Sequence, residues 1–456
     1  MTECTREEIR SKAPGRREFV ARFDGGEITS DAGGLLLGAV EERRGILKRF
    51  AGCFSDHRTP SRIEHTAQEL VSQRVLAIAL GYEDVIDHTE LRHDSLLAAL
   101  TGKADPTEPL AAPATLHRLE LSHPELAAGD RYCKISLDPE AVDELLIDLF
   151  LETHDEPPAE VILDLDATDD PIHGKQEGRF FHGYYDCYCY LPLYIFVGDH
   201  LLCARLRTSD RDGAAGSLEE LDRIVPRIRA AWPQTRIVVR GDSGFCREWL
   251  MAWCEKREGV EYVLGIARNE RLSGVIEAEL EEARQLYERS GKPERLFKSF
   301  DYRTLKSWSS SRRVVGKAEH LERGSNPRFV VTSFTEEEWD SRRLYEELYC
   351  ARGEMENRIK EQQLDLFADR TSACVMRANQ VRLYFSSLAY VLLSELRRIG
   401  LAGTKMARAQ CGTIRLKLLK IGARVRVTVR KIWVAMSESW PHRELLLHAW
   451  HKLRAT

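Results

Sequence analysis

The spacing of hydrophobic and polar positions predicts that the chain begins with a mainly helical part. Apolar residues recur at helical spacing over 35–40 and again over 69–79. The stretch 102–113 is rich in Pro and Ala and is typical of a loop or linker. Helical spacing resumes over 140–151 and ends at the Pro pair 157–158. We therefore expect a helical N-terminal region over 1–110 and a helical connector over 111–158.

The pattern changes to strands after this break. A strand is expected over 161–166, and a meander of three more strands over 184–188, 191–197 and 201–205. Further along, helical and extended patterns alternate, with helices over 218–232 and 245–257 and strands over 236–240 and 261–266. This order is typical of an α/β fold, whose first part we place at 159–267.

The segment 268–342 departs from that alternation, because a charged helix over 274–290 is followed by short strands. We interpret it as a β-rich insertion. Helical patterns over 341–364 and 376–398 then predict the second part of the core, over 343–398. The remaining segment, 399–456, forms a basic C-terminal region.

Composition places the chain among ordinary globular proteins. Of 456 residues, 43% are hydrophobic and 30% charged. The sequence lacks an apolar run of the roughly 18 residues that a membrane helix needs, and its first residues are charged and polar. The 11 Cys are scattered, and the group His173, His182, Cys187 and Cys189 matches no common zinc spacing. We expect a cytoplasmic protein with no membrane partner and reduced thiols.

Charge is distributed unevenly. The net charge is -5, yet residues 401–456 hold 12 Lys and Arg against two acids. Such a segment indicates either a phosphate-binding face or a solvated helix surface. The side chains that could follow a DNA backbone are Lys417, Lys420, Arg424, Arg426 and Arg430.

Three acids stand out by position. Asp166 ends the first core strand, Asp242 directly follows the strand over 236–240, and Glu356 lies on the helix after the insertion. Strand ends at one edge of an α/β sheet are where functional groups collect. Carboxylates are the ligands that Mg²⁺ prefers, and two metal ions can activate the attacking and leaving oxygens of phosphoryl transfer. Asp164 is a rival to Asp166, because it lies on the same strand face.

The helix around Glu356 carries two more polar residues on the same face. Tyr349, Arg352 and Glu356 are spaced i, i+3, i+7. An Arg beside a metal-binding Glu suits a phosphate oxygen, since its guanidinium donates two hydrogen bonds. A phenol nearby can contact sugar or phosphate.

These residues carry a resemblance to a known family. The run Tyr349-x-x-Arg352-x-x-x-Glu356 resembles the Y-R-E-K helix of DDE-type insertion-sequence transposases, which have an RNase H-like core. Other runs are similar to the insertion sequence 1380 group, and they span roughly residues 20 to 450: FDGG (23–26), TSDAGG (29–34), ALGYED (79–84) with His88, DLDAT (164–168), RGDSGF (240–245) and ANQ (378–380).

The resemblance implies a bacterial transposase that acts on nucleoid DNA and moves an insertion sequence by cut and paste. It implies Asp166, Asp242 and Glu356 as catalytic ligands of two Mg²⁺ or Mn²⁺ ions, and Tyr349 and Arg352 as DNA contacts. The partner would be double-stranded DNA, both terminal inverted repeats and target, with the N-terminal region recognising the repeats and a homodimer pairing two ends.

Two details of the family pattern fall on particular residues. The usual Lys seven residues after the Glu is Gln363 in this chain, and Lys360 is the alternative basic residue. If the reaction passes through a DNA hairpin, an aromatic ring would stack on a flipped base. Trp308 is the candidate for that ring, with a packed core Trp as its alternative role.

Two other functions fit parts of the sequence. The DLDAT run resembles the DxDxT loop of haloacid-dehalogenase-type phosphatases, with Asp164 as nucleophile. That alternative lacks a second acid four residues after Asp242, where Cys246 stands. A catalytically idle, transposase-derived DNA-binding protein is the other alternative.

Overall fold

The chain folds into two compact units in the computed structural model, which describes residues 8–13, 15–123, 125 and 130–455. One unit comprises Met1–Leu137 and Leu388–Thr456, and the other comprises Asp138–Ser387. The boundary between Ser387 and Leu388 falls inside helix α14 (Met376–Glu395).

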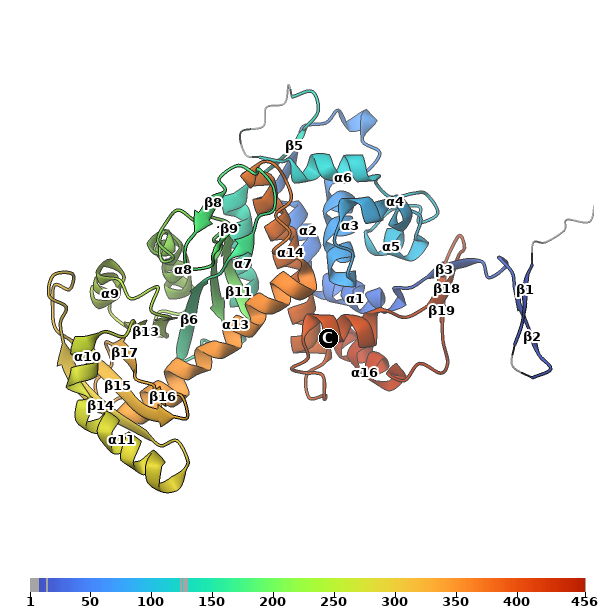
Figure 1. Ribbon diagram of the computed structural model, residues 1–456. Coiled ribbons are helices and arrows are strands. Elements are labelled where there is room, and N and C mark those ends of the chain that lie inside the picture. The colour runs from blue at the N-terminus through green and yellow to red at the C-terminus, as the bar shows by residue number, and fades with distance from the viewer. Residues whose placement is uncertain (1–7, 14, 124, 126–129, 456) are drawn as a thin grey trace, which may run out of the picture. The chain divides into compact units, whose positions relative to one another are not determined.

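A nine-stranded mixed sheet forms the centre of the unit Asp138–Ser387 (Figure 1). Strand β10 is antiparallel to both of its neighbours, β11 and β6, whereas β12 and β13 continue parallel to β6. This order and these directions confirm the expected RNase H-like α/β core. The sheet runs in the order β11 (His200–Arg205), β10 (Leu193–Val197), β6 (Glu160–Ala167), β12 (Arg236–Gly241), β13 (Val260–Ile266), β17 (Arg328–Thr332), β15 (Arg312–Leu321), β14 (Arg295–Tyr302), with β16 (Gly324–Ser325) beside β15.

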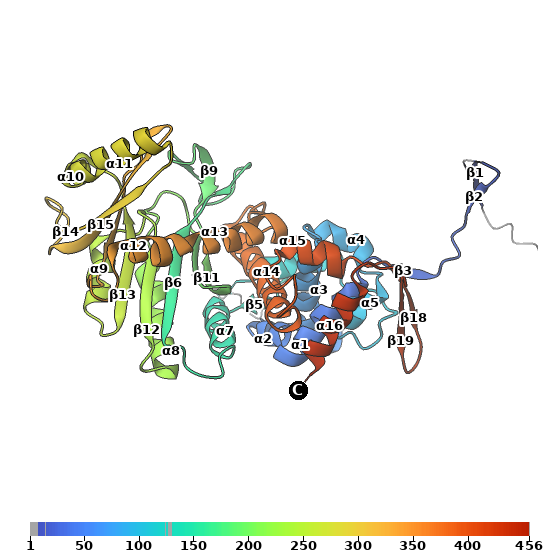
Figure 2. The same ribbon diagram turned by 90° about the horizontal axis from the view of Figure 1, so that it is seen from below.

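The segment 268–342 extends this sheet. Strand β17 pairs antiparallel with β13, and β15 and β14 add further antiparallel strands. Helices α10 (Glu270–Val275) and α11 (Glu277–Ser290) precede these strands, and α11 contacts β14 and β15 (Figures 1 and 2). The strands of the segment are thus part of the central sheet.

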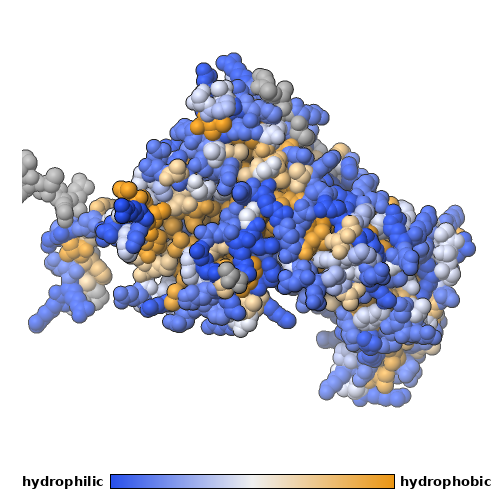
Figure 3. All heavy atoms as spheres, turned by 180° about the vertical axis from the view of Figure 1, so that it is seen from behind, coloured by the Kyte–Doolittle hydropathy of each residue, from blue (hydrophilic) through white to orange (hydrophobic). Residues whose placement is uncertain are grey.

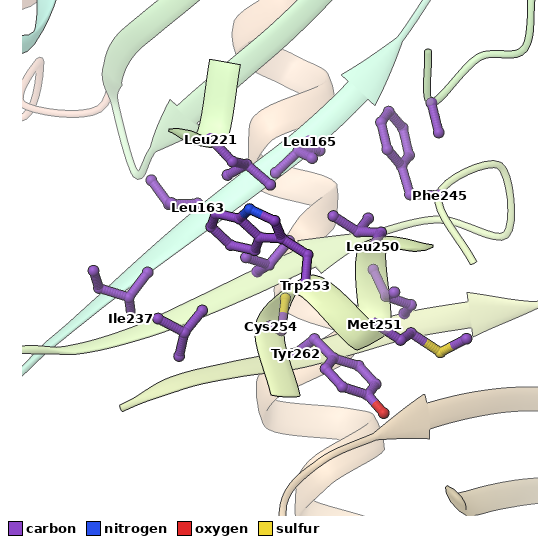
Figure 4. Packing of buried hydrophobic residues seen from close by; sticks show 14 of the residues in the cluster. Leu163, Leu165, Leu221, Ile237, Phe245, Leu250, Met251, Trp253, Cys254 and Tyr262 are labelled. Carbon is purple, nitrogen blue, oxygen red and sulfur yellow. The ribbon is translucent and has the colours of Figure 1, made fainter. Parts of the chain in front are cut away.

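The two faces of the sheet are covered by different helices. Helices α8 (Ser217–Ala231) and α9 (Glu248–Glu255) supply one hydrophobic core, in which Trp253 and Leu250 pack with Leu163 of β6 and Ile237 of β12 (Figure 4). Residues alternate between faces along a strand, so Val238 points to the other side. There, a second core joins the sheet to the helix that carries Glu356.

That helix is continuous over residues 341–365, which agrees with the helical pattern predicted over 341–364. It contains short π-helical turns, which often occur in helices that carry functional residues. Its segments are α12 (Ser341–Arg343), η4 (Leu344–Tyr349), η5 (Cys350–Arg352), α13 (Gly353–Lys360) and η6 (Glu361–Asp365).

The unit Met1–Leu137 and Leu388–Thr456 is mainly helical, with short strands. One small sheet, in the order β19-β18-β3, joins the two ends of the chain. The described strands of this unit are β1 (Ile9–Lys12), β2 (Glu18–Ala21), β3 (Glu27–Thr29), β4 (Phe54–Asp56), β5 (Ile135–Leu137), β18 (Ala423–Val427) and β19 (Ile432–Met436). Its longer described helices are α1 (Leu35–Arg44), α2 (Ile46–Ala51), α3 (Ala67–Leu80), α5 (Ser95–Leu100), α6 (Pro113–Glu120) and α16 (Arg443–Arg454).

Hydrophilic side chains cover most of the face shown in Figure 3, with smaller apolar patches between them. Among the described residues, no helix combines the length and apolar character required to cross a bilayer.

Candidate active site

Asp166 and Asp242 lie side by side at the carboxyl ends of two parallel strands. In the pairing of β6 with β12, Leu165 is opposite Gly241, so the next residue on each strand is the acid. Adjacent parallel strands are about 4.8 Å apart. The sheet therefore brings two acids that are 76 positions apart in sequence to one edge.

The run RGDSGF folds into a turn that fixes Asp242. The Gly244 amide donates a 2.8 Å hydrogen bond to Oδ1 of Asp242. The ring of Phe245 turns back into the core (Figure 4), where 1% of the residue is exposed. A Cβ on Gly241 would lie 2.9 Å from the Phe245 Cβ, so this position requires glycine.

Asp164 has a structural role instead. Only 2% of it is exposed, and both of its oxygens accept hydrogen bonds from Arg240, at 2.5 Å from Nε and 2.7 Å from Nη2. A carboxylate held in this way is not available as a nucleophile. The dehalogenase-type alternative therefore fails, and it is Asp166, the other rival on β6, that lines the cavity described below.

Glu356 reaches the same cavity from α13, together with Arg352. Nη2 of Arg352 donates a 2.6 Å hydrogen bond to Oε1 of Glu356, and its Nη1 lies 3.5 Å from Oδ2 of Asp166. The guanidinium thus partly neutralises two of the three acids. It cannot serve both fully, because Nη1 is buried and has no hydrogen-bond partner.

Tyr349 lies one helical turn before Arg352, and its hydroxyl fits against β13 because residue 265 is a glycine without a side chain. A Cβ on Gly265 of β13 would be 2.5 Å from the Tyr349 hydroxyl and 3.0 Å from the Ser243 amide nitrogen. Burial raises the pKa of Tyr349, and the charge of Asp242 acts in the same direction. The hydroxyl is therefore protonated at neutral pH and sits close to Asp242.

The three acids share one cavity of about 560 Å³. Burial raises the pKa of Asp166 to about 7, with a further contribution from the charge of Asp242 and an opposing one from Arg352. Burial raises this pKa because it disfavours the charged form of the carboxyl group, which a bound cation would favour. The lining residues are Asp166, Ala167, Thr168, His182, Tyr184, Tyr185, Leu191, Gly213, Asp242, Ser243, Gly244, Phe245, Arg352, Glu356, Ile359, Lys360 and Gln363.

The donor chemistry of this cavity fits divalent cations. Three carboxylates at one cavity supply the hard oxygen ligands that suit Mg²⁺ or Mn²⁺. In the described part of the chain, however, no three potential ligands are already close enough together to hold an ion. Arg352 occupies the space between Asp166 and Glu356 as their counter-charge.

Three aromatic residues of the cavity were not predicted from the sequence. His182, Tyr184 and Tyr185 come from the hairpin of β8 (Phe180–His182) and β9 (Cys187–Tyr190). Tyr184 is 85% exposed, and Phe181 of the same hairpin is 53% exposed. The density of aromatic residues over 180–190 was the available signal.

Gln363, at the position of the usual family Lys, also lines the cavity. Its Nε2 donates hydrogen bonds to the Asp169 carbonyl at 3.1 Å and to Oδ1 of Asp170 at 2.9 Å. Asp170 is fully buried, and burial raises its pKa to about 8. The side-chain amide of Gln363 is therefore hydrogen-bonded to a buried acid, and the exposed Lys360 is the basic residue at this end of the cavity lining.

Trp308 does not present its ring to a ligand. It is 5% exposed and packs edge-on against Tyr302, with 5.7 Å between ring centroids. The Arg312 guanidinium lies 5.5 Å from its ring centroid. The packed-core role describes Trp308, and its assignment as a base-stacking residue was wrong because the ring is enclosed.

The basic residues of the C-terminal region differ in their surroundings. Lys417, Arg424 and Arg426 are exposed. On the β18–β19 hairpin, Arg426 is paired with Trp433, which is 50% exposed. Lys420 instead forms a 2.7 Å ion pair with Asp31 and lies 3.9 Å from the ring centroid of Tyr82.

The mixed sheet, with three acids at one cavity beside it, is an RNase H-like core. The chain belongs to the family described as Transposase DDE domain group 1, whose model matches residues 12–456. Among solved structures, it is similar to the piggyBac transposase in a synaptic complex with hairpin DNA, with 10% sequence identity, a TM-score of 0.41, and coverage of 85% of this chain and 79% of that chain. No curated protein sequence matches the chain at a significant level.

Proposed function

We propose that this protein excises an insertion sequence at its terminal inverted repeats and joins it to target DNA, with Asp166, Asp242 and Glu356 as catalytic residues. One observation carries the proposal. In a chain of the DDE transposase family, three carboxylates from β6, the end of β12 and α13 line one cavity. The finer placement in the insertion sequence 1380 group rests on the motif order.

The three carboxylates would hold two Mg²⁺ or Mn²⁺ ions, which when bound supply Lewis-acid activation of the attacking and leaving oxygens. Arg352 partly neutralises Asp166 and Glu356 in the free protein. Once that task is relieved, its planar guanidinium can donate two hydrogen bonds to oxygens of the scissile phosphate. Tyr349 keeps its proton and can donate one hydrogen bond beside Asp242.

The β8–β9 hairpin is suited to hold DNA at the cavity. Tyr184 and Phe181 are exposed aromatic residues, and such rings stack on unpaired bases of any sequence. Tyr188 of the same hairpin has the Arg179 guanidinium 3.9 Å from its ring centroid. Lys360 adds a positive charge to the lining. These residues replace Trp308 in our proposal for DNA contact.

The β18–β19 hairpin is a second surface suited to DNA. Arg424 and Arg426 alternate with buried residues along β18, so both point to the same exposed face as Trp433. Strand pairs with basic and aromatic side chains fit a DNA groove or backbone. Lys417 is exposed nearby in sequence, whereas the charge of Lys420 is taken up by Asp31.

Cleavage of DNA that carries the element's terminal repeats tests this function. With Mg²⁺ or Mn²⁺, the unchanged protein should cleave at the repeat boundary, and Asp166→Asn, Asp242→Asn and Glu356→Gln should each lose at least 1,000-fold in rate, about 4 kcal/mol. The matched control is Glu354→Gln, an exposed acid on the same helix. Equal cleavage by Asp242→Asn would refute the proposal, and tight binding without any cleavage would favour the idle DNA-binding alternative.

We also propose that two subunits pair two element ends. The proposal rests on the logic of the reaction, since two ends must be joined to one target. Mass measurement with and without end DNA tests it, and a single subunit on paired ends would contradict it.

A further inference from the structure

The unit Met1–Leu137 and Leu388–Thr456 contains a cavity that the proposed reaction does not use. It has a volume of about 450 Å³. Its walls come from helix α6, the short helix η2 (Pro60–Arg62), the start of α3 and the segment that leads into β5. Cavities of 300 to about 1,000 Å³ accommodate small molecules or single residues of a polymer.

Positive charge dominates the walls. The lining holds one acid, Glu64, whose side chain is 87% exposed and whose Oε1 lies 3.7 Å from Nε2 of His65. Against it stand Arg62, Arg118, Arg131 and Lys134, none of which has a carboxylate partner within hydrogen-bond or ion-pair distance in the described part of the chain. Arg58 is the exception, because Asp56 accepts hydrogen bonds from its Nε at 2.8 Å and its Nη2 at 2.6 Å. In a chain of net charge -5, cations gathered around a concavity concentrate positive potential there.

The floor holds a buried polar group that lacks a partner. His65 is 7% exposed, and its Nδ1 has no hydrogen-bond partner. Burial and the nearby charge of Lys103 lower the pKa of His65, so the ring is neutral at neutral pH and does not repel the surrounding cations. A buried polar atom left unsatisfied is costly, which is expected where a ligand or water completes the site.

An exposed aromatic ring stands at the rim. Tyr132 is 67% exposed, and the Arg131 guanidinium lies 5.3 Å from its ring centroid. Exposed tyrosines next to arginines are the usual stacking platform for a nucleic-acid base. Cations for a phosphate and a ring for a base therefore meet at one cavity.

We propose that this cavity binds an unpaired nucleotide of single-stranded DNA. The phosphate lies against Arg62, Arg118 and Lys134, and the base stacks on Tyr132. A paired duplex can present only its backbone to a cavity of this size, because its bases are stacked inside. The inference deepens the proposed function and rests on it for the source of the strand.

Binding measurements on the full chain test the inference separately from catalysis. All proteins carry Asp242→Asn to prevent cleavage, and fluorescence anisotropy follows an oligothymidine of about 15 nucleotides, near the length that one single-strand site covers. Tyr132→Ala and Arg118→Ser should each weaken binding about tenfold. The matched controls replace exposed residues outside the cavity lining. They are Phe23→Ala, which removes a ring that is 95% exposed, and Lys256→Ser, which removes an exposed cation. Both should bind the oligothymidine within twofold of the parent.

Three further results decide the outcome. The Tyr132 and Arg118 variants should bind a blunt duplex of equal length as the parent does, and thymidine monophosphate should compete only weakly. Unchanged single-strand binding in both variants would overturn the inference, and so would an equal loss on duplex. Competition by the mononucleotide as strong as by the oligonucleotide would assign the cavity to free nucleotides instead. Because these binding measurements do not require cleavage, they can be interpreted even if the unchanged protein fails to cleave DNA in the separate catalytic assay.

Discussion

Arg352 forms an ion pair with Glu356 one helical turn further along, with 2.6 Å between Nη2 and Oε1. Its other nitrogen faces Asp166 at 3.5 Å. One guanidinium thus stands where a divalent cation would lie between two acids. The free protein therefore carries an internal counter-charge for a site that we propose is filled by metal during catalysis.

Replacing Arg352 should make the protein more dependent on metal. In Arg352→Gln the acids lose their cation, and we expect a loss of about 1 kcal/mol, a modest value because Glu356 is 42% exposed. Added Mn²⁺ should then raise the Tm of Arg352→Gln more than that of the unchanged protein. Thermal unfolding with and without Mn²⁺ measures this. A lowered Tm with no Mn²⁺ response would argue against the metal site.

Gly265→Ala should disturb Tyr349 and the Asp242 turn together. The added Cβ would lie 2.5 Å from the Tyr349 hydroxyl and 3.0 Å from the Ser243 nitrogen. We expect a loss of about 1–3 kcal/mol in stability, typical of overpacking, and at least a tenfold lower cleavage rate. Adding Tyr349→Phe should restore part of the stability, since it removes the clashing oxygen. Gly274→Ala, where nothing lies within 4 Å of the new Cβ, is the control, and equal effects of both substitutions would contradict the prediction.

Asp170 predicts a pH-dependent stability. Burial raises its pKa to about 8, whereas the unfolded chain releases this proton near pH 4. Between these values the folded state holds one proton more, so stability falls as pH rises, by up to about 1.4 kcal/mol per pH unit. Asp170→Asn stays neutral and should lose that slope between pH 5 and about 8. Urea unfolding across this range measures it, and an identical slope in the variant would rule out Asp170 as its source.

Tyr184→Ala should lose DNA affinity but not stability, and Trp308→Ala should lose stability. The exposed Tyr184 is predicted to contact DNA, so its loss should weaken binding of frayed end DNA about tenfold and leave Tm unchanged. The enclosed Trp308 should lose about 3–5 kcal/mol of stability. Calorimetry and anisotropy on both variants separate the two roles. A lower Tm for Tyr184→Ala with unchanged DNA binding would reverse our assignment.

Local patterns were sufficient to predict the elements that carry the acids. The strand expected over 161–166 is β6 (Glu160–Ala167), and the strand expected over 236–240 is β12 (Arg236–Gly241). In both strands the acid stands three residues after a run of three apolar residues, so the hydrophobic pattern and the functional end lie close together. Motif order then placed Glu356 with them, which periodicity alone could not do.

Contacts between distant residues were beyond the sequence patterns. Whether Asp164 or Asp166 faces the cavity depends on Arg240 in the neighbouring strand, since its ion pair seals Asp164. The same holds for Trp308, whose enclosure depends on Tyr302 and Arg312. The sequence patterns could not predict that β17 pairs with β13 and that β15 and β14 continue the sheet beyond it, because strand pairing is set by tertiary packing.

A crystal structure of the protein with Mn²⁺ and a cleaved repeat end tests the central claim most directly, since manganese is located by its anomalous scattering. We predict two manganese peaks bounded by Asp166, Asp242 and Glu356, with Arg352 moved from Glu356 to the phosphate. Peaks at other residues, or none while Arg352 still holds Glu356 on bound DNA, would contradict the account.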